Sequence, residues 1–164
     1  MNDFNIRIYT EDKELPELLE GNFFHSKELF LIEEQTPKDT PYMAIATRDG
    51  KVRGQLLVVV RRRGSLFPPY LYTHAHAHGE GCYADEKETE TIFPLLLKAI
   101  TLQLRHRLCF YIEFSDMKKK MFGYRYFRRL GYFPIAWQEI HHSLHSKAPE
   151  SRLSAKMENI VERM

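Results

Sequence analysis

Several features that would identify a class of protein are scarce in this 164-residue sequence. Its two cysteines, Cys82 and Cys109, are too few for a disulfide framework, so we expect a reduced, cytoplasmic chain. No apolar run approaches the ~20 residues that cross a bilayer, and residues 1–25 are acidic, unlike a signal peptide. The net charge of +2 argues against a chain that is basic throughout and binds nucleic acid by charge alone.

The composition is typical of a globular protein, with 43% hydrophobic and 28% charged residues. The length fits one domain and is short for two. We expect this domain to cover residues 1–148. A final helix over residues 149–164 keeps an apolar stripe to its end, so it either packs back on the domain or leads into a second lobe that is not present here.

The small net charge is a cancellation between blocks of opposite sign. Residues 11–39 hold nine acidic and three basic side chains, whereas residues 118–129 hold six basic side chains and no acidic one. This basic block, Lys118–Arg129, also contains Phe122, Tyr124 and Tyr126, and such a mixture is typical of nucleic-acid or phosphate contacts. The alternative is a solvated helix face that balances the acidic segment near residue 85.

Apolar periodicity and turn residues predict an alternation of strands and helices. The expected strands cover residues 4–9, 42–47, 52–60, 70–76, 108–114 and 132–143. The expected helices cover residues 12–20, 26–35, 85–107, 118–130 and 149–164. Ser26 should cap its helix, Asp49-Gly50 should form a hairpin turn, and the apolar run 56–60 should be buried on both faces. The order β-α-α-β-β-β-α-β-α-β, with a helix after it, indicates an α/β (α+β) fold.

Polar side chains alternate along two of the expected strands. His74, His76 and His78 share one face of the first strand, and Glu113 shares the polar face of the second with Ser115, because successive side chains of a strand point to opposite faces. If the strands are neighbours, His76 or His78 should lie near Glu113 at the point where they separate. Glu113 is therefore our first candidate for a general base, and the alternative is an ordinary surface or ion-paired carboxylate.

The same histidines raise the question of a metal ion. Alternate strand positions are about 6.5–7 Å apart, so two imidazoles can reach one zinc ion, but the third lies ~13 Å from the first. A third ligand would have to come from elsewhere, and Glu80, Cys82 and Glu113 are candidates. We favour imidazoles that line a groove without a metal.

The element order resembles the GNAT acyltransferase fold, a mixed, mostly antiparallel sheet flanked by helices, whose fourth and fifth strands separate to hold an acyl thioester. His76-Ala77-His78-Gly79-Glu80-Gly81 is similar to the family's pyrophosphate loop, and Tyr126-Phe127-Arg128-Arg129-Leu130-Gly131-Tyr132 to its aromatic-x-x-Leu-Gly-aromatic segment. Glycines that open a helix turn backbone N–H groups toward a phosphate, and the alternative is that Gly79 and Gly81 only turn the chain. The resemblance implies an acetyl-CoA or other acyl-CoA donor.

The resemblance also implies roles for particular residues. The family's leaving-group acid is a tyrosine on the later helix, and the matching position looks like Phe127, which has no proton to donate, so Tyr124 or Tyr126 would take this role. Glu113 would be the base. The residues implied in binding substrate or acyl donor are His74, His76, His78, Gly79, Gly81, Arg125 and Arg128.

A closer resemblance is to the FemAB-type peptidoglycan-bridge aminoacyltransferases, whose two lobes are each GNAT-like. It rests on Phe23-Phe24-His25-Ser26-Lys27, on the hairpin sequence from Met43 to Gly54, and on Tyr111-Ile112-Glu113-Phe114. It implies transfer of an amino acid from an aminoacyl-tRNA to an amine of a cell-wall precursor, with tRNA contact through Lys118–Arg129. The sequence has room for one lobe, which we expect to be the N-terminal one, completed by a second lobe or a homodimer.

Three functions therefore stay open. The first is an acyl- or aminoacyl-transferase domain of GNAT-like and FemAB-like type. The second is a free-standing acetyl-CoA-dependent N-acetyltransferase. The third is a non-catalytic lobe that binds a precursor, a nucleic acid or another subunit.

Overall fold

The computed structural model describes residues 4–64, 66, 71–107, 109, 111–115 and 122–135. The chain divides into two compact units, Met1–Phe133 and Pro134–Met164, and every helix and strand described below lies in the first.

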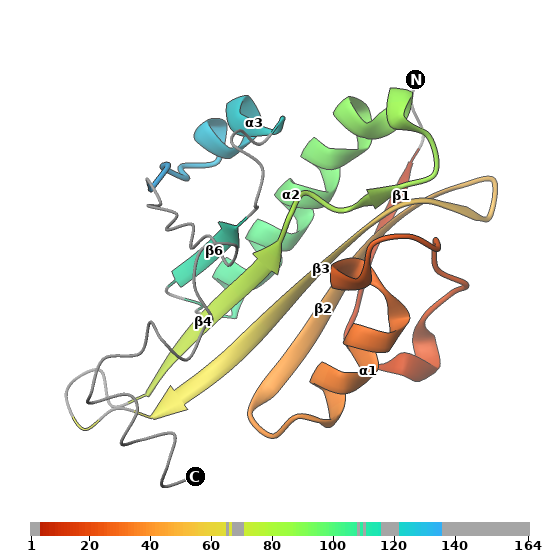
Figure 1. Ribbon diagram of the computed structural model, residues 1–164. Helices are drawn as coiled ribbons and strands as arrows, with labels where there is room; N and C mark the ends of the chain where they lie inside the picture. The colour runs from red at the N-terminus through yellow and green to blue at the C-terminus, as the bar shows by residue number, and fades with distance from the viewer. Residues whose placement is uncertain are drawn as a thin grey trace, which may run out of the picture. The chain divides into compact units, whose positions relative to one another are not determined.

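A six-stranded sheet organises this first unit (Figure 1). Along the sheet the strands follow the order β1 (Asn5–Tyr9), β2 (Asp39–Arg48), β3 (Lys51–Gly64), β4 (Leu71–His78) and β6 (Tyr111–Ser115). The short β5 (Cys82–Tyr83) pairs with β3. All pairings are antiparallel except that of β4 with β6, whose crossover contains the helix α2 (Thr89–His106). The mixed, mostly antiparallel sheet predicted from the sequence is confirmed.

Local signals place the first helix and the first hairpin where the sequence predicted them. The hydroxyl of Ser26 accepts a hydrogen bond from the Leu29 N–H (3.2 Å) and so caps α1 (Lys27–Gln35). Asp49 and Gly50 have φ angles of 52° and 74°, the pair of positive values that a tight turn between twisted strands requires. Both elements are therefore determined by residues close in sequence.

The core lies in two layers, one on each face of the sheet. On one face, α2 buries an apolar stripe that includes Ile92, Leu96 and Ile100 against β2, β3 and β4. On the other face, the fully buried Phe30 of α1 packs among residues of β2 and β3. Residues 56–60 of β3 are buried and contribute alternately to both layers, as the continuous apolar run predicted.

The expected helix over residues 12–20 is wrong. Only a 3₁₀ turn forms, over Asp12–Glu14, and Leu15 is extended with φ −67° and ψ 131°. Pro16 explains the difference, because its ring disfavours a helical conformation in the residue before it and it has no N–H for a helical hydrogen bond.

Three further boundaries differ from expectation. The glycine loop does not open a helix directly, since β5 and a 3₁₀ turn at Glu86–Glu88 come between Gly81 and α2. The later half of the expected basic helix is α3 (Tyr124–Arg129), and residues 116–121 lie outside the described residues. Residues 132–135, where the expected last strand should begin, have no regular structure. Residues 136–143 and the final helix lie outside the described residues.

Candidate functional site

Five polar side chains form a row along β4 and β6, on the face of the sheet that α1 occupies farther along. We define the polar strip as these five residues, which are His74, His76, His78, Glu113 and Ser115. The parallel pairing places His76 opposite Glu113 and His78 opposite Ser115. Side chains alternate along a strand, so the intervening Ala75 and Ala77 face α2 and are buried there. The expected neighbouring position of the two strands is confirmed.

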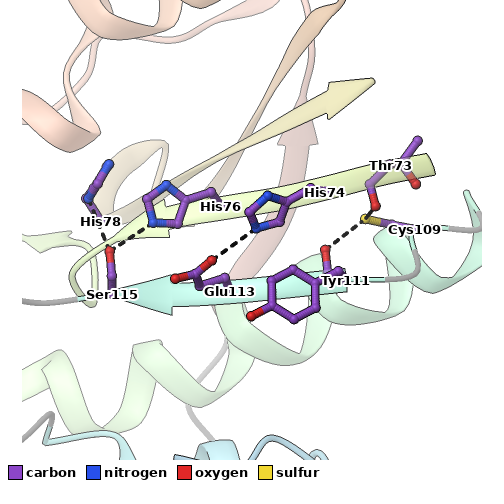
Figure 2. Close-up of polar contacts among 8 residues, drawn as sticks. All are labelled: Thr73, His74, His76, His78, Cys109, Tyr111, Glu113 and Ser115. Carbon is purple, nitrogen blue, oxygen red and sulfur yellow. Dashed lines mark hydrogen bonds and ion pairs between the residues drawn. The ribbon is translucent and has the colours of Figure 1, made fainter. Parts of the chain in front are cut away.

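The members of the polar strip contact one another across the two strands (Figure 2). His74 Nε2 lies 3.1 Å from Glu113 Oε2, and because a carboxylate only accepts hydrogen bonds, this nitrogen is the donor. Ser115 Oγ lies 2.9 Å from His76 Nε2 and 3.2 Å from His78 Nδ1. The strip therefore consists of an imidazole–carboxylate pair beside a hydroxyl shared by two imidazoles.

The two imidazoles that share the hydroxyl are neutral at pH 7. Burial, followed by the neighbouring His78, lowers the pKa of His76 to about 4. Burial and the Arg61 guanidinium lower the pKa of His78. A neutral imidazole has one donor and one acceptor nitrogen, so the Ser115 hydroxyl can donate to one ring and accept from the other. Such a chain can move a proton along the strip.

An aromatic pair closes one end of the strip. The ring of Phe24 lies 4.6 Å from that of His78, and Phe23 beside it is half exposed. Both belong to a 3₁₀ turn, Phe23–His25, that is held on β3 because the buried Gln55 donates to the His25 carbonyl (2.7 Å). At the other end, the Tyr111 ring lies 4.8 Å from that of His74. Sequence reasoning did not select either aromatic contact, and only the FemAB resemblance drew attention to Phe23-Phe24.

The glycine loop follows β4 directly at the end of the strip. Gly79 and Gly81 both have positive φ angles, 80° and 99°. Their N–H groups are already engaged: that of Gly79 donates to the Ser115 carbonyl (2.6 Å), and that of Gly81 donates to His25 Nε2 (3.0 Å). The glycines therefore turn the chain, and their amides bind protein groups.

A pyrophosphate does not fit this loop. It requires several N–H groups that face one point, whereas the N–H groups of Gly79 and Gly81 bond to two different parts of the protein. The following segment is acidic, and Asp85 uses its carboxylate to cap the next 3₁₀ turn through the Lys87 N–H (2.9 Å). The residues of this loop thus do not match the phosphate end of the acyl-CoA that the GNAT resemblance implies.

Helix α3 lies on the opposite face of the sheet from the strip. Its buried Phe127 packs on Phe114, with ring centroids 5.0 Å apart, and Phe114 alternates with Glu113 and Ser115 along β6. The Tyr126 hydroxyl donates to the Glu90 carbonyl (3.2 Å), whereas Tyr124 is 44% exposed. The structure does not bring either tyrosine into contact with the described residues of the strip.

Helix α3 enters the core through Phe127, which is buried, and Tyr126 and Leu130 are partly buried against the same cluster. Phe122, just before the helix, is 42% exposed. Arg125 and Arg128 point away from the core with Arg129, and all three side chains are exposed. Lys118–Lys120 lie outside the described residues. The described part of the basic block is thus a solvent-facing basic helix surface.

The described residues bear on two questions that the sequence raised, metal binding and membrane insertion. No group of three or more His, Cys, Asp or Glu side chains among them is placed to hold a metal ion. Within the same part of the chain, no helix is both long enough and apolar enough to cross a membrane.

Comparisons with known proteins bear on the fold. No protein-family model matches the chain, and no curated protein matches it. Solved structures do. An aminoglycoside acetyltransferase, meta-AAC0020 from an uncultured soil metagenomic sample, is 11% identical, with a TM-score of 0.52 over 88% of this chain and 96% of that one. A tetramutant of the BH1408 protein from Bacillus halodurans is 15% identical, with a TM-score of 0.52 over 71% and 73% of the two chains.

The chain has a GNAT-like fold. At these identities the likeness concerns the fold, and the activities of these proteins are their own. By their order in the sheet, β4 and β6 take the places of the fourth and fifth strands of that fold. Their pairing continues to His78 and Ser115, so the separation that the resemblance implied does not occur within the described residues. The polar strip lies along this pair.

Proposed function

We propose that this chain is an N-acyltransferase domain, which moves an acyl group from an activated ester or thioester to an amine bound at the polar strip. The observation that carries the proposal is the His74–Glu113 pair on the two parallel strands of a GNAT fold, next to the hydroxyl that His76 and His78 share. A structural sheet face does not need such a row of polar groups, of which His74, His76, Glu113 and Ser115 are partly buried.

The chemistry begins with removal of a proton from the acceptor. An alkyl amine has a pKa near that of lysine, about 10.4, so at pH 7 it arrives protonated and cannot attack. Glu113 accepts this proton directly or through a water molecule, and His74 holds the carboxylate in place through its Nε2–H. The pair thereby converts the ammonium into a nucleophile.

The bond changes then follow. The amine nitrogen attacks the carbonyl carbon of the donor and forms a C–N bond, and the C–O or C–S bond to the leaving group breaks. Negative charge develops on the carbonyl oxygen, and the neutral rings of His76 and His78, with Ser115, offer the nearest N–H and O–H donors on the strip. As the amide forms, the attacking nitrogen releases its second proton and the leaving oxygen or sulfur takes one up. Tyr124 is the candidate donor because the Tyr126 hydroxyl donates to Glu90. Since α3 lies across the sheet from the strip, this role requires the leaving group to reach Tyr124 past the ends of β4 and β6.

The glycine loop and the arginines of α3 bear on which acyl donor the domain uses. An acyl-CoA would meet a glycine loop whose amides are engaged. An aminoacyl ester at the 3′ end of a tRNA has no pyrophosphate and needs no such loop, and its phosphates would suit the exposed Arg125, Arg128 and Arg129. These observations support the FemAB-like form of the proposal, with a cell-wall-precursor amine as acceptor and a second lobe or partner copy completing the enzyme.

The test is a transfer assay with two donors in parallel. Acetyl-CoA and an aminoacyl-tRNA pool are each incubated with the protein and a set of primary amines that includes a lysine-containing cell-wall peptide, and amide products are identified by mass. We expect product from the aminoacyl-tRNA. Product from acetyl-CoA together with micromolar binding of acetyl-CoA by calorimetry would replace the tRNA-type donor. No product from either donor with folded protein would reject N-acyl transfer.

A further inference from the structure

Glu80 is an acidic side chain in the middle of the glycine loop, and it is buried. Only 6% of its surface is exposed. An ionised carboxylate is costly to bury unless charged groups or hydrogen-bond donors compensate it. The role of Glu80 therefore depends on what its two oxygens contact.

Both oxygens accept hydrogen bonds from backbone amides at the start of α3. The Phe122 N–H donates to Oε2 (2.9 Å), and the Gly123 N–H donates to Oε1 (2.5 Å). Bonds from N–H groups to a carboxylate are short and about twice as strong as bonds between neutral groups. The carboxylate thus links the loop after β4 to a segment more than forty residues later in the chain.

The surroundings of Gly123 are built closely around this contact. A Cβ at position 123 would lie 2.8 Å from Glu80 Oε1 and would collide with the ring of Phe93 on α2. Glycine therefore lets the backbone approach both the carboxylate and the helix. The Phe122 ring also rests on Phe93, with centroids 5.0 Å apart.

The backbone around Glu80 is fixed on its other side as well. The Gly79 N–H bonds to Ser115 of the polar strip, the Gly81 N–H bonds to His25, and the Tyr83 hydroxyl donates to the Glu80 carbonyl (2.6 Å). One short loop thus connects the end of the strip with the start of the helix that carries Tyr124.

We infer that Glu80 is a positioning residue, whose carboxylate holds the start of α3 against the ends of β4 and β6 and makes the glycine loop a structural brace in place of a phosphate cradle. The significance for catalysis rests on the proposed function, because the brace sets where Tyr124 and the exposed arginines of α3 lie relative to the strip. The brace consists of hydrogen bonds, so its existence can be tested without an activity assay.

The first test uses amide signals of the full chain labelled with both ¹³C and ¹⁵N. In the wild type we expect a scalar coupling through the hydrogen bond from the Gly123 nitrogen to the Glu80 carboxyl carbon, and slow hydrogen exchange at Phe122 and Gly123. In Glu80→Gln, exchange at both amides should be at least tenfold faster, because a carboxamide offers one acceptor oxygen for two donors. Glu86→Gln, the same change at an exposed acid of the next turn, should leave both amides unchanged.

The second test adds coenzyme A to the wild type. The Gly79 and Gly81 amide signals should not move at millimolar coenzyme A. Saturable shifts of these two signals would overturn the brace, and so would unchanged exchange at Phe122 and Gly123 in a folded Glu80→Gln protein. If that variant does not fold, the wild-type coupling decides: its absence rejects the inference.

An activity readout separates a positioning role from a general loss of structure, once transfer has been measured. Glu80→Gln should lower kcat about tenfold and leave the KM for the acceptor amine within twofold, since the strip itself is intact. A tenfold rise in the KM for the acceptor amine would mean that the substitution disturbs the strip itself, and it would reject positioning through α3. If no transfer is found at all, the proposed function fails while the amide measurements still judge the brace.

Discussion

The two halves of the sheet differ in what lies on their faces. Around β2 and β3, apolar side chains cover both faces, with α1 on one side and α2 on the other. Along β4 and β6, one face is apolar and packs on α2, whereas the other carries the polar strip. The first half can be explained by burial alone. The second half keeps polar groups half-buried at a cost in free energy, which is why we place the function there.

The largest effect should come from the apolar half. Phe30→Ala removes a fully buried ring from the layer between α1 and the sheet, so the free energy of unfolding should fall by about 3–5 kcal/mol. Urea denaturation followed by circular dichroism measures the change. Phe23→Ala, at a half-exposed phenylalanine near the strip, is the matched control and should cost less than about 1 kcal/mol. Similar losses for both variants would remove the distinction between the two halves.

In the polar half, a substitution should lower activity much more than it lowers stability. Glu113→Gln keeps the size of a side chain that is 26% exposed, so the free energy of unfolding should change by less than about 1 kcal/mol. The transfer rate should fall about 100-fold, the effect of removing a general base. Glu86→Gln serves as the control for loss of one negative charge. An unchanged transfer rate in Glu113→Gln would show that Glu113 is not the base.

A third variant measures how firmly α3 is fixed to the polar half. Gly123→Ala places a methyl group against Phe93 and Glu80, so the free energy of unfolding should fall by about 1–3 kcal/mol. Gly64→Ala is the control, because a Cβ there meets nothing within 4 Å. Thermal unfolding of the two variants gives the comparison. Equal melting temperatures would mean that the backbone at Gly123 is not closely packed.

Much of the fold could be predicted because it follows from local rules. The Ser26 cap, the Asp49-Gly50 turn and the alternation of histidines with alanines along β4 depend on neighbours within a few residues. The expected helix over residues 12–20 failed on a rule of the same kind, since Pro16 interrupts it. Local chemistry thus accounts for these successes and for that error.

The site was less predictable because its contacts are distant in sequence. The sequence placed the histidines and Glu113 on facing strands and expected His76 or His78 near Glu113, and the register does pair His76 with Glu113. The imidazole that hydrogen-bonds to the carboxylate, however, is that of His74. Side-chain reach across a parallel pair has no signature in the spacing of residues. The same holds for the contact of Glu80 with Gly123, where the sequence indicated only an acid among glycines.

The smallest effect should appear in the pH dependence of stability, and it belongs to the polar half. Burial and the neighbouring His78 lower the pKa of His76 to about 4 in the folded chain, against about 6.5 when unfolded. Glu113, His74 and Arg61 also face this ring, and Glu113 alone favours its protonation. Between pH 6.5 and 4 the unfolded chain binds a proton that the folded chain does not, so stability is complete above pH 6.5 and falls as the pH is lowered.

Because His76 is only half-buried, screening reduces the loss to about 1–2 kcal/mol. His76→Asn removes the titrating group, so the free energy of unfolding should fall less between pH 6.5 and 4 in this variant than in the wild type. Urea denaturation at several pH values measures the slope. His106→Asn, at an exposed histidine of α2, should keep the wild-type slope. Parallel slopes for the wild type and His76→Asn would show that the His76 imidazole is solvated as freely as one on an open surface, and the polar strip would then no longer differ from ordinary polar surface in this respect.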